Sequence, residues 1–347
     1  MRSPTLAARP RLSPGTSLAA LLVVPLVGGC RELPLALGDD NSIIVTASPE
    51  LWGEVEAALV GGLERTVFTV RDEKTFTVTW GDYGGEDWVR LRQLRQQLVV
   101  GSPEDPWMAR ALGKVDGPVV PPALRQVEDV WARGQVATLM VVEEGRERDG
   151  VMEMIPSAAD LYDEWFRARA LSRMFVTRPD SALARSLAGH DGFWVLVPEV
   201  YDHRISDSVH MFRNDNPDPS ELIRQVTVTW QTPIAPEFGV PELLAWRAEV
   251  VDSHYGYPQI VDTTRSLERR VALNGRETHS YQAVWQNPPG EYPAAGPFVT
   301  HAVLCPEQDR RYLIDAWLYA PGRDKYEYMI QLEQIVGSFA CGDGVRL

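Results

Sequence analysis

The spacing of apolar residues predicts alternating strands and helices from residue 42 onward. The apolar run 42–47 (SIIVTA) is typical of a buried strand. Ser48 and Pro49 then supply an N-cap and a first-turn proline for an amphipathic helix that reaches about Gly61. The Gly- and charge-rich stretch 143–150 indicates a boundary, so we expect a first domain over 42–150. Its other expected elements are a strand pair at 67–70 and 75–80, a helix at 86–98 and a buried strand at 136–142.

A second block of strands and helices is expected over 151–342. A long helix should start near Pro156 to Asp160, and a last helix near Asp324, with Glu327 completing a capping box. Strands connected in series between helices favour an α+β fold, with two α/β-sandwich-like domains whose sheets are mainly antiparallel. The remaining elements expected in this block are strands at 193–197, 209–213, 226–230, 280–286, 299–305 and 311–320, and a helix at 241–256.

The first 29 residues have the pattern of a lipoprotein signal peptide. Three arginines and no acidic residue precede an apolar stretch at 18–27, which as a helix rises only about 15 Å, half of a bilayer core. Val27-Gly28-Gly29-Cys30 then matches a lipobox, which predicts cleavage before Cys30 and lipid attachment to its thiol. The alternatives are an ordinary signal peptide or a buried strand with an incidental cysteine.

This lipobox also predicts where the protein resides. Acyl chains on Cys30 would bind membrane lipid and hold the body at the bacterial cell envelope. Arg31 follows, and no aspartate there indicates retention at the inner membrane, so analogy favours the outer membrane, with the body in the periplasm or at the surface. We expect residues 30–41 to form a tether and residues 343–347 a short tail.

Composition and charge narrow the range of partners. A chain of 347 residues with 44% hydrophobic residues can bury substantial cores. Lys and Arg total 34 against 48 Asp and Glu, a formal net charge of −14. This balance repels polyanions, so we expect no nucleic-acid partner.

Residues 296–339 resemble the C-terminal part of a family of bacterial lipoproteins classified as domain of unknown function 4837. The shared motifs are Gly296-Pro297-Phe298-Val299, Tyr319-Ala320-Pro321 and Leu332-Glu333. Similar opening elements at 43–45 and 51–52 extend the resemblance over nearly the whole mature chain, although the family's Pro- and Gln-rich stretch is absent at 65–70. The resemblance implies the anchor and the fold but no catalytic residue. The closing strand and helix also resemble PsbP/Mog1-type sandwiches in architecture.

Cys305 and Cys341 are positioned for a disulfide in an oxidising compartment. The strand 311–319 should run about 30 Å away from the turn at 306–310, and the helix 324–339 should return about 24 Å. Cys341 should therefore end near Cys305, while two free thiols remain the alternative.

His301 and Asp315 are the candidate catalytic residues. If Cys305 pairs with Arg311 across the hairpin, His301 lies opposite Asp315, and the carboxylate could orient the imidazole as a base. The alternative is a structural His–Asp pair beneath the last helix, and a disulfide to Cys341 favours that alternative because it brings this helix over the same face.

No metal or cofactor is expected. Residues 214–221 (NDNPDPSE) offer several oxygen ligands for calcium, but they lack the spacing of a calcium loop and are explained as a helix cap. GxSxG, GxGxxG, Walker A, HExxH and CxxC motifs are missing from the sequence. We therefore expect a non-catalytic binding or scaffolding lipoprotein whose partner is an envelope protein. The alternative is a periplasmic enzyme, such as a hydrolase, that uses the His301/Asp315 region.

Overall fold

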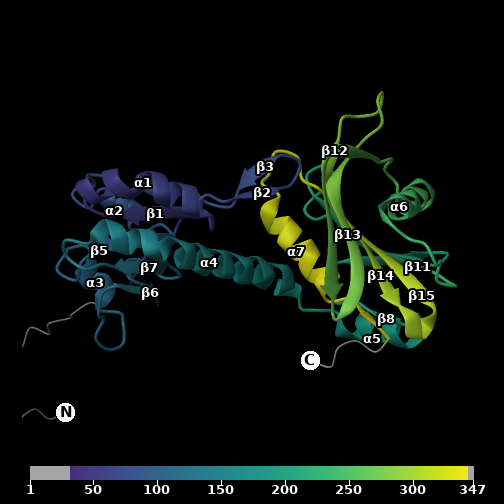
Figure 1. Cartoon of the computed structure of the whole chain (residues 1–347), viewed down its shortest axis with the longest axis horizontal. Helices are drawn as coiled ribbons and strands as arrows, with labels where there is room; N and C mark the ends of the chain where they lie inside the picture. Colours follow the sequence, from purple (N-terminus) through teal and green to yellow (C-terminus); the bar gives the residue numbers. More distant parts are fainter. Residues whose placement is uncertain (1–31, 343–347) are drawn as a thin grey trace, which may run out of the picture. The chain divides into compact units, whose positions relative to one another are not determined.

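The computed structural model describes residues 32–342 (Figure 1). The expected signal peptide over 1–29, the lipidation site Cys30 and the tail over 343–347 lie outside the described residues. From Pro34 onward the chain clusters as one compact unit. None of its described helices combines the length and the apolar character needed to cross a membrane.

The first block is built on a five-stranded sheet with mainly parallel pairing. Its elements are β1 (Ser42–Thr46), α1 (Pro49–Leu63), β4 (Thr77–Trp80), α2 (Trp88–Leu91), β5 (Gln96–Gly101), α3 (Met108–Leu112), β6 (Ala123–Glu128) and β7 (Val136–Val141). The strand order is β4-β1-β5-β7-β6, and only β6 pairs antiparallel. β5 and β7 are buried along their whole length, as is typical of parallel strands covered on both faces. The expectation of antiparallel pairing is therefore wrong for this sheet.

Two local expectations in this block are also wrong. The helix expected at 86–98 ends at Leu91, because residues Gln96–Gly101 form the buried strand β5 beside β1. The strands β2 (Thr66–Phe68) and β3 (Asp72–Lys74) pair with each other, whereas β4 pairs with β1 and not with the strand before it.

The long helix α4 (Glu147–Met174) crosses the boundary expected at residue 150. It begins nine residues before Pro156, which lies inside the helix. Its apolar face packs with α1 on one face of the first sheet, while α2 and α3 pack on the other face. Within the range expected as a tether, the described residues contact the body: Leu35 bridges to Arg133 and Leu37 to Leu94, and Asp40 is buried.

The second block is a seven-stranded antiparallel sheet between helices. The sheet order is β12-β13-β14-β15-β11-β10-β9. Its elements are α5 (Ser181–His190), β8 (Phe193–Trp194), β9 (Asp202–Ser206), β10 (Val209–Asn214), β11 (Ile223–Gln231), α6 (Val240–His254), β12 (Ile260–Leu273), β13 (Arg276–Gln286), β14 (Ala295–Cys305), β15 (Arg310–Tyr319), α7 (Tyr326–Gly337) and β16 (Ala340–Cys341). Helix α7 packs on one face and α6 on the other, so the mixed α+β class with mostly antiparallel, sandwich-like layers is confirmed.

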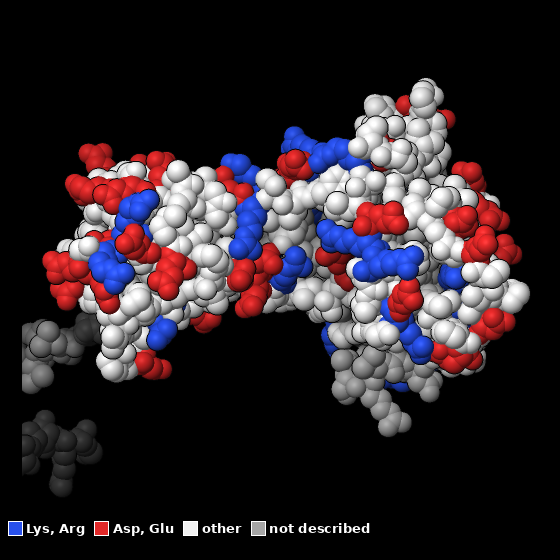
Figure 2. All heavy atoms as spheres, in the orientation of Figure 1, with Lys and Arg blue, Asp and Glu red and all other residues white. Residues whose placement is uncertain are grey.

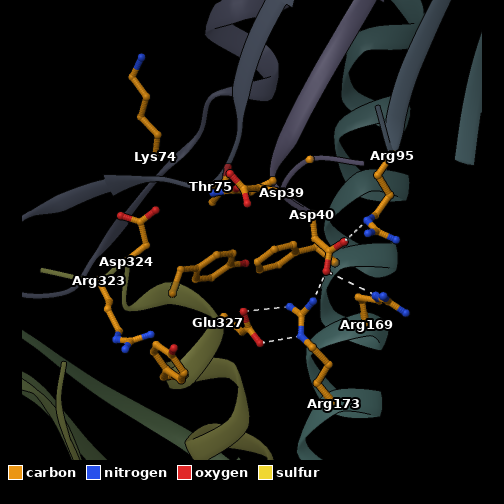
Figure 3. A pocket seen from close by; sticks show the side chains of 15 residues that line it. Asp39, Asp40, Lys74, Thr75, Arg95, Arg169, Arg173, Arg323, Asp324 and Glu327 are labelled. Carbon is orange, nitrogen blue, oxygen red and sulfur yellow. Dashed lines mark hydrogen bonds and ion pairs between the residues drawn. The ribbon is translucent and has the colours of Figure 1, made fainter. Parts of the chain in front are cut away.

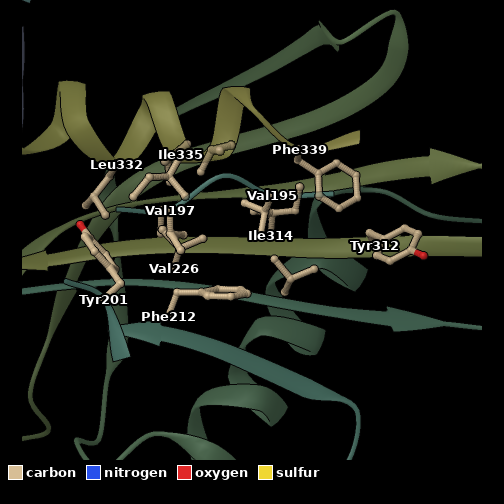
Figure 4. Close-up of a cluster of buried hydrophobic side chains, with 14 of the residues drawn as sticks. Val195, Val197, Tyr201, Phe212, Val226, Tyr312, Ile314, Leu332, Ile335 and Phe339 are labelled. Atoms are coloured by element: carbon tan, nitrogen blue, oxygen red, sulfur yellow. The ribbon is translucent and has the colours of Figure 1, made fainter. Parts of the chain in front are cut away.

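Alternation along β15 divides the two cores. Tyr312 and Ile314 point into the core beneath α7, where Leu332, Ile335 and Phe339 meet them (Figure 4). Leu313 and Trp317 belong to the other core, beneath α6. Because successive side chains along a strand point to opposite faces, a shift of one residue decides which core a polar side chain enters. On the surface, acidic and basic side chains are interspersed over the face shown in Figure 2.

Candidate functional site

The structure separates the two candidate catalytic residues. In the β14–β15 pair, Cys305 lies opposite Arg310, so His301 lies opposite Ile314, and Asp315 lies opposite Thr300. The expected register is wrong by one residue, because the turn is one residue shorter than assumed. His301 therefore faces α7 and Asp315 faces α6, and the predicted His301–Asp315 pair does not form.

Asp315 belongs to a buried ion pair. Its Oδ1 accepts a hydrogen bond from Arg247 Nε at 2.7 Å, and the two side chains are 0% and 1% exposed. Its Oδ2 accepts from the Tyr255 hydroxyl at 2.8 Å, and Arg247 Nη2 donates to Gln259 Oε1 at 2.7 Å. Burial, together with the Asp315 charge, raises the pKa of Tyr255 well above its ordinary value, so this hydroxyl remains a donor. The network is closed to ligands and acts in stability.

His301 lines a small cavity beneath α7. The cavity has a volume of about 260 Å³, and Arg269, Ser280 and Glu333 also line it. Within the described part of the chain, Nδ1 of His301 has no hydrogen-bond partner, and burial lowers the pKa of the imidazole to about 4. The ring is therefore neutral at physiological pH. No hydrogen bond among residues 32–342 joins it to Ser280 or Glu333, so a relay for catalysis is not assembled here.

The remaining predicted residues lie elsewhere. Cys305 and Cys341 are joined in a disulfide, with their Cα atoms 6.1 Å apart. Residues 214–221 form no helix: Asn214 ends β10 and the rest is a loop, in which Asp218 Oδ1 accepts from the backbone N–H of Ser220 at 2.8 Å, as in a local turn. The described residues hold no group of three or more His, Cys, Asp or Glu side chains placed to bind a metal ion.

A polar cavity of about 450 Å³ lies where α4, α7 and the segment before β1 meet (Figure 3). At its centre the carboxylate of Asp40 forms ion pairs with three arginines: Arg95 at 2.7 Å, Arg169 at 3.4 Å, and Arg173. Arg173 also forms an ion pair with Glu327 of α7 at 2.9 Å. The other two basic side chains in the wall are also paired, Lys74 with Glu64 and Arg323 with Glu221. Each of its cations therefore has a carboxylate partner, and the cluster ties the N-terminal segment to two helices.

A second cavity, the aromatic cleft, has the features of a ligand site. Its volume is about 580 Å³, which is within the range of small-molecule sites. No lysine or arginine is among its described lining residues. The side chains that give it its chemistry are Asp218, Tyr257, Trp285, Asn287, Glu291, Tyr292, Trp317 and Tyr319.

The two tryptophans of the aromatic cleft differ in their hydrogen bonding. Trp285 of β13 and Trp317 of β15 pack edge to face, with ring centroids 5.5 Å apart. Trp285 Nε1 donates to the Leu318 carbonyl at 3.1 Å, whereas Trp317 Nε1 has no partner in residues 32–342. Gly296 makes the first contact possible, because a Cβ there would overlap the Leu318 carbonyl oxygen and approach Trp285 Nε1 to 2.7 Å.

The outer wall of the aromatic cleft is the loop between β13 and β14. Asn287 closes this loop: its backbone N–H donates to Ala294 at 2.9 Å and its Nδ2 to the Tyr292 carbonyl at 2.6 Å. Tyr292 itself is 73% exposed. An exposed aromatic ring beside buried ones is typical of a surface that binds a partner. The sequence analysis did not identify this cleft; the only signal was the concentration of aromatic residues at 281–292 and 312–319.

Comparison with known proteins identifies one domain of the chain. No curated protein sequence matches the chain. Among solved structures, it is similar to the Ran-binding protein Mog1p of Saccharomyces cerevisiae, with 11% identity and a TM-score of 0.29, covering 43% of this chain and 90% of that one. A mutant of protein Mog1 gives 10% identity and a TM-score of 0.28 over the same shares. These values concern architecture alone. The family model described as Domain of unknown function (DUF4837) matches residues 224–338, which confirms the predicted family resemblance over β11 to α7 and includes most of the aromatic cleft.

Proposed function

We propose that this protein is a lipid-anchored envelope protein with a non-catalytic binding role, and that the aromatic cleft is its binding site. The observation that carries the binding role is the composition of the cleft: five aromatic side chains surround a cavity of about 580 Å³, and two of them, Tyr257 and Tyr292, are exposed. Pockets of this kind, mostly apolar with a few polar groups, are the usual small-molecule sites.

The anchor rests on the lipobox at Val27-Gly28-Gly29-Cys30. The segment that follows Cys30 is attached to the folded body by backbone hydrogen bonds. Arg133 donates a backbone hydrogen bond to the Pro34 carbonyl, so the body holds the chain at a position four residues after Cys30. Four residues span at most about 14 Å, so an acylated Cys30 would keep the body near the membrane surface. The ligand would then be a component of the envelope.

The enzyme alternative loses its basis. It required His301 and Asp315 in one open pocket, but the two side chains lie on opposite faces of the sheet and Asp315 is committed to Arg247. A binding role needs no such pair.

Cys30→Ser tests the anchor. The variant should move from the membrane fraction to the soluble fraction of the envelope, because the acyl chains that hold the chain at the bilayer can no longer be attached. Membrane fractionation and mass spectrometry of the native chain measure this. Gly29→Ala keeps a small residue before Cys30 and should remain in the membrane fraction. An unmodified amino terminus on the parent chain would contradict the anchor.

A photo-crosslinking residue at Tyr292 tests the binding site. Irradiation of cells should give a defined adduct with an envelope component, since Tyr292 is the most exposed aromatic side chain of the cleft. The same crosslinker at Tyr83, which is 39% exposed and outside the cleft, is the matched control. Equal labelling at both positions, or none at Tyr292, would end the assignment of the cleft as the binding site.

A further inference from the structure

We propose that the ligand of the aromatic cleft is a neutral saccharide. This inference rests on the proposed function, because it names the ligand class of the same site. Three properties of the cleft lead to it: the ring faces, the charge of the wall and two polar atoms that lack partners.

The ring faces supply the first argument. Tyr257, Tyr292 and Tyr319 surround the two tryptophans, and Tyr257 packs against Trp317 with centroids 6.5 Å apart. The face of an aromatic ring carries partial negative charge. The C–H groups on one side of a pyranose ring carry the complementary partial positive charge. A sugar therefore stacks on such a ring while its hydroxyl groups remain free for hydrogen bonds around the edge.

The charge of the wall supplies the second argument. Asp218 and Glu291 line the cleft, and none of its described lining residues is basic. Arg213 lies over the Tyr257 ring, 5.3 Å from its centroid, and is paired with Asp215 at 3.2 Å. An anion, such as a phosphate or a uronic acid, would therefore meet two carboxylates in the wall and no basic side chain among the described lining residues. A carboxylate is an acceptor only, and sugar hydroxyl groups supply the donors that it needs.

The unpartnered atoms separate a saccharide from an organic cation. Within residues 32–342, Trp317 Nε1 lacks an acceptor and Asn287 Oδ1 lacks a donor, and Trp317 is 1% exposed. A buried polar group without a partner destabilises the free protein. A quaternary ammonium ion could stack in the cleft, but it cannot accept from the indole N–H. A hydroxyl group both donates and accepts, so one ligand class satisfies both atoms.

The two atoms are closed to water in the free structure, so a ligand reaches them after a small movement of the wall. The loop that carries Asn287 and Tyr292 is the part that can move, because it lies between strands and its outer ring is exposed. We therefore expect binding to order this loop.

Calorimetric titration of the detergent-solubilised full chain tests the proposal. The probes are three neutral sugars (triacetylchitotriose, cellotriose and maltotriose), one acidic sugar (trigalacturonic acid) and tetramethylammonium as a cation without a hydroxyl group. At least one neutral sugar should bind. Tyr292→Ala should weaken it by about tenfold through loss of a stacking face, and Trp317→Phe by a similar factor through loss of the indole donor. Tyr83→Ala, in an exposed tyrosine outside the cleft, should leave the affinity unchanged.

The outcomes are distinct. Tetramethylammonium or trigalacturonic acid binding in place of the neutral sugars overturns the proposal, and so does neutral-sugar binding that Tyr292→Ala does not weaken. Absence of heat with every neutral sugar at millimolar concentration also overturns it. If the crosslinker at Tyr292 still gives an adduct in that case, the cleft remains a binding site for another ligand, so the two failures can be told apart. Because Trp317 is buried, Tyr292→Ala carries the test if Trp317→Phe fails to fold.

Discussion

Asp315→Asn is expected to lower the free energy of unfolding by about 3–5 kcal/mol. The guanidinium of Arg247 is 1% exposed and lies over the Phe298 ring, 3.9 Å from its centroid, so it cannot turn to water when its carboxylate partner loses its charge. The substitution also replaces an oxygen that accepts from Tyr255. The loss is large because it leaves the desolvated charge of Arg247 without its counter-ion and replaces one of the two accepting oxygens by a donor.

Denaturant unfolding of the full chain measures this effect. Asp116→Asn, in an exposed aspartate, should change the free energy by less than about 0.5 kcal/mol. Arg247→Met combined with Asp315→Leu should recover most of the loss, because removing both charges also removes the cost of burying them. If Asp315→Asn costs less than about 1 kcal/mol, the pair is not the interaction that holds α6 on the sheet.

The wrong prediction for the position of Asp315 shows that the local sequence predicts strands but not their register. The strands at 299–305 and 311–319 are recognisable from their alternation, and the structure has both of them. Their register depends on the turn between them, where Asp309 adopts a left-handed conformation at φ 51° and Arg310 already pairs with Cys305. A difference of one residue in that turn moves Asp315 from the face of His301 to the face of Arg247.

Other differences have a long-range cause. The capping box expected from Asp324 and Glu327 is not used. Glu73 of β3 accepts hydrogen bonds from the backbone N–H groups of Lys325 at 2.7 Å and Tyr326 at 3.2 Å instead. The cap comes from about 250 positions earlier in the sequence, so no local pattern could reveal it. Strand β12 was missed because most of its residues are exposed and it has no apolar alternation.

The two blocks also differ in how well pattern predicts pairing. In the second block, apolar and polar residues alternate along the strands, which indicates a sheet whose two faces have different environments. Such alternation is typical of antiparallel sheets, and the seven-stranded sheet is antiparallel. In the first, the continuous apolar runs at 42–47 and 136–142 indicated buried strands without their direction. The aromatic cleft could not be predicted from the sequence, because its wall combines β13, β15 and two loops that only the fold brings together.

Removal of the disulfide is the second large effect that we expect. Cys341→Ser should lower the free energy of unfolding by about 3–4 kcal/mol, because the bridge closes a segment with a sequence separation of 36 and restricts the unfolded chain. Cys341 is the better position for the substitution, since Cys305 is fully buried in the core beneath α7. The change also frees β16, which pairs with β8 beside this core.

Denaturant unfolding with and without dithiothreitol separates the bridge from the side chain. The parent chain should lose stability on reduction, whereas Cys341→Ser should not respond, because its remaining described cysteine has no partner to lose. Thiol titration of the denatured, unreduced chain should find neither Cys305 nor Cys341 reactive. Two reactive thiols at these positions, or equal stability of the parent chain with and without dithiothreitol, would contradict this prediction. Packing of α7 alone would then hold β16 beside β8.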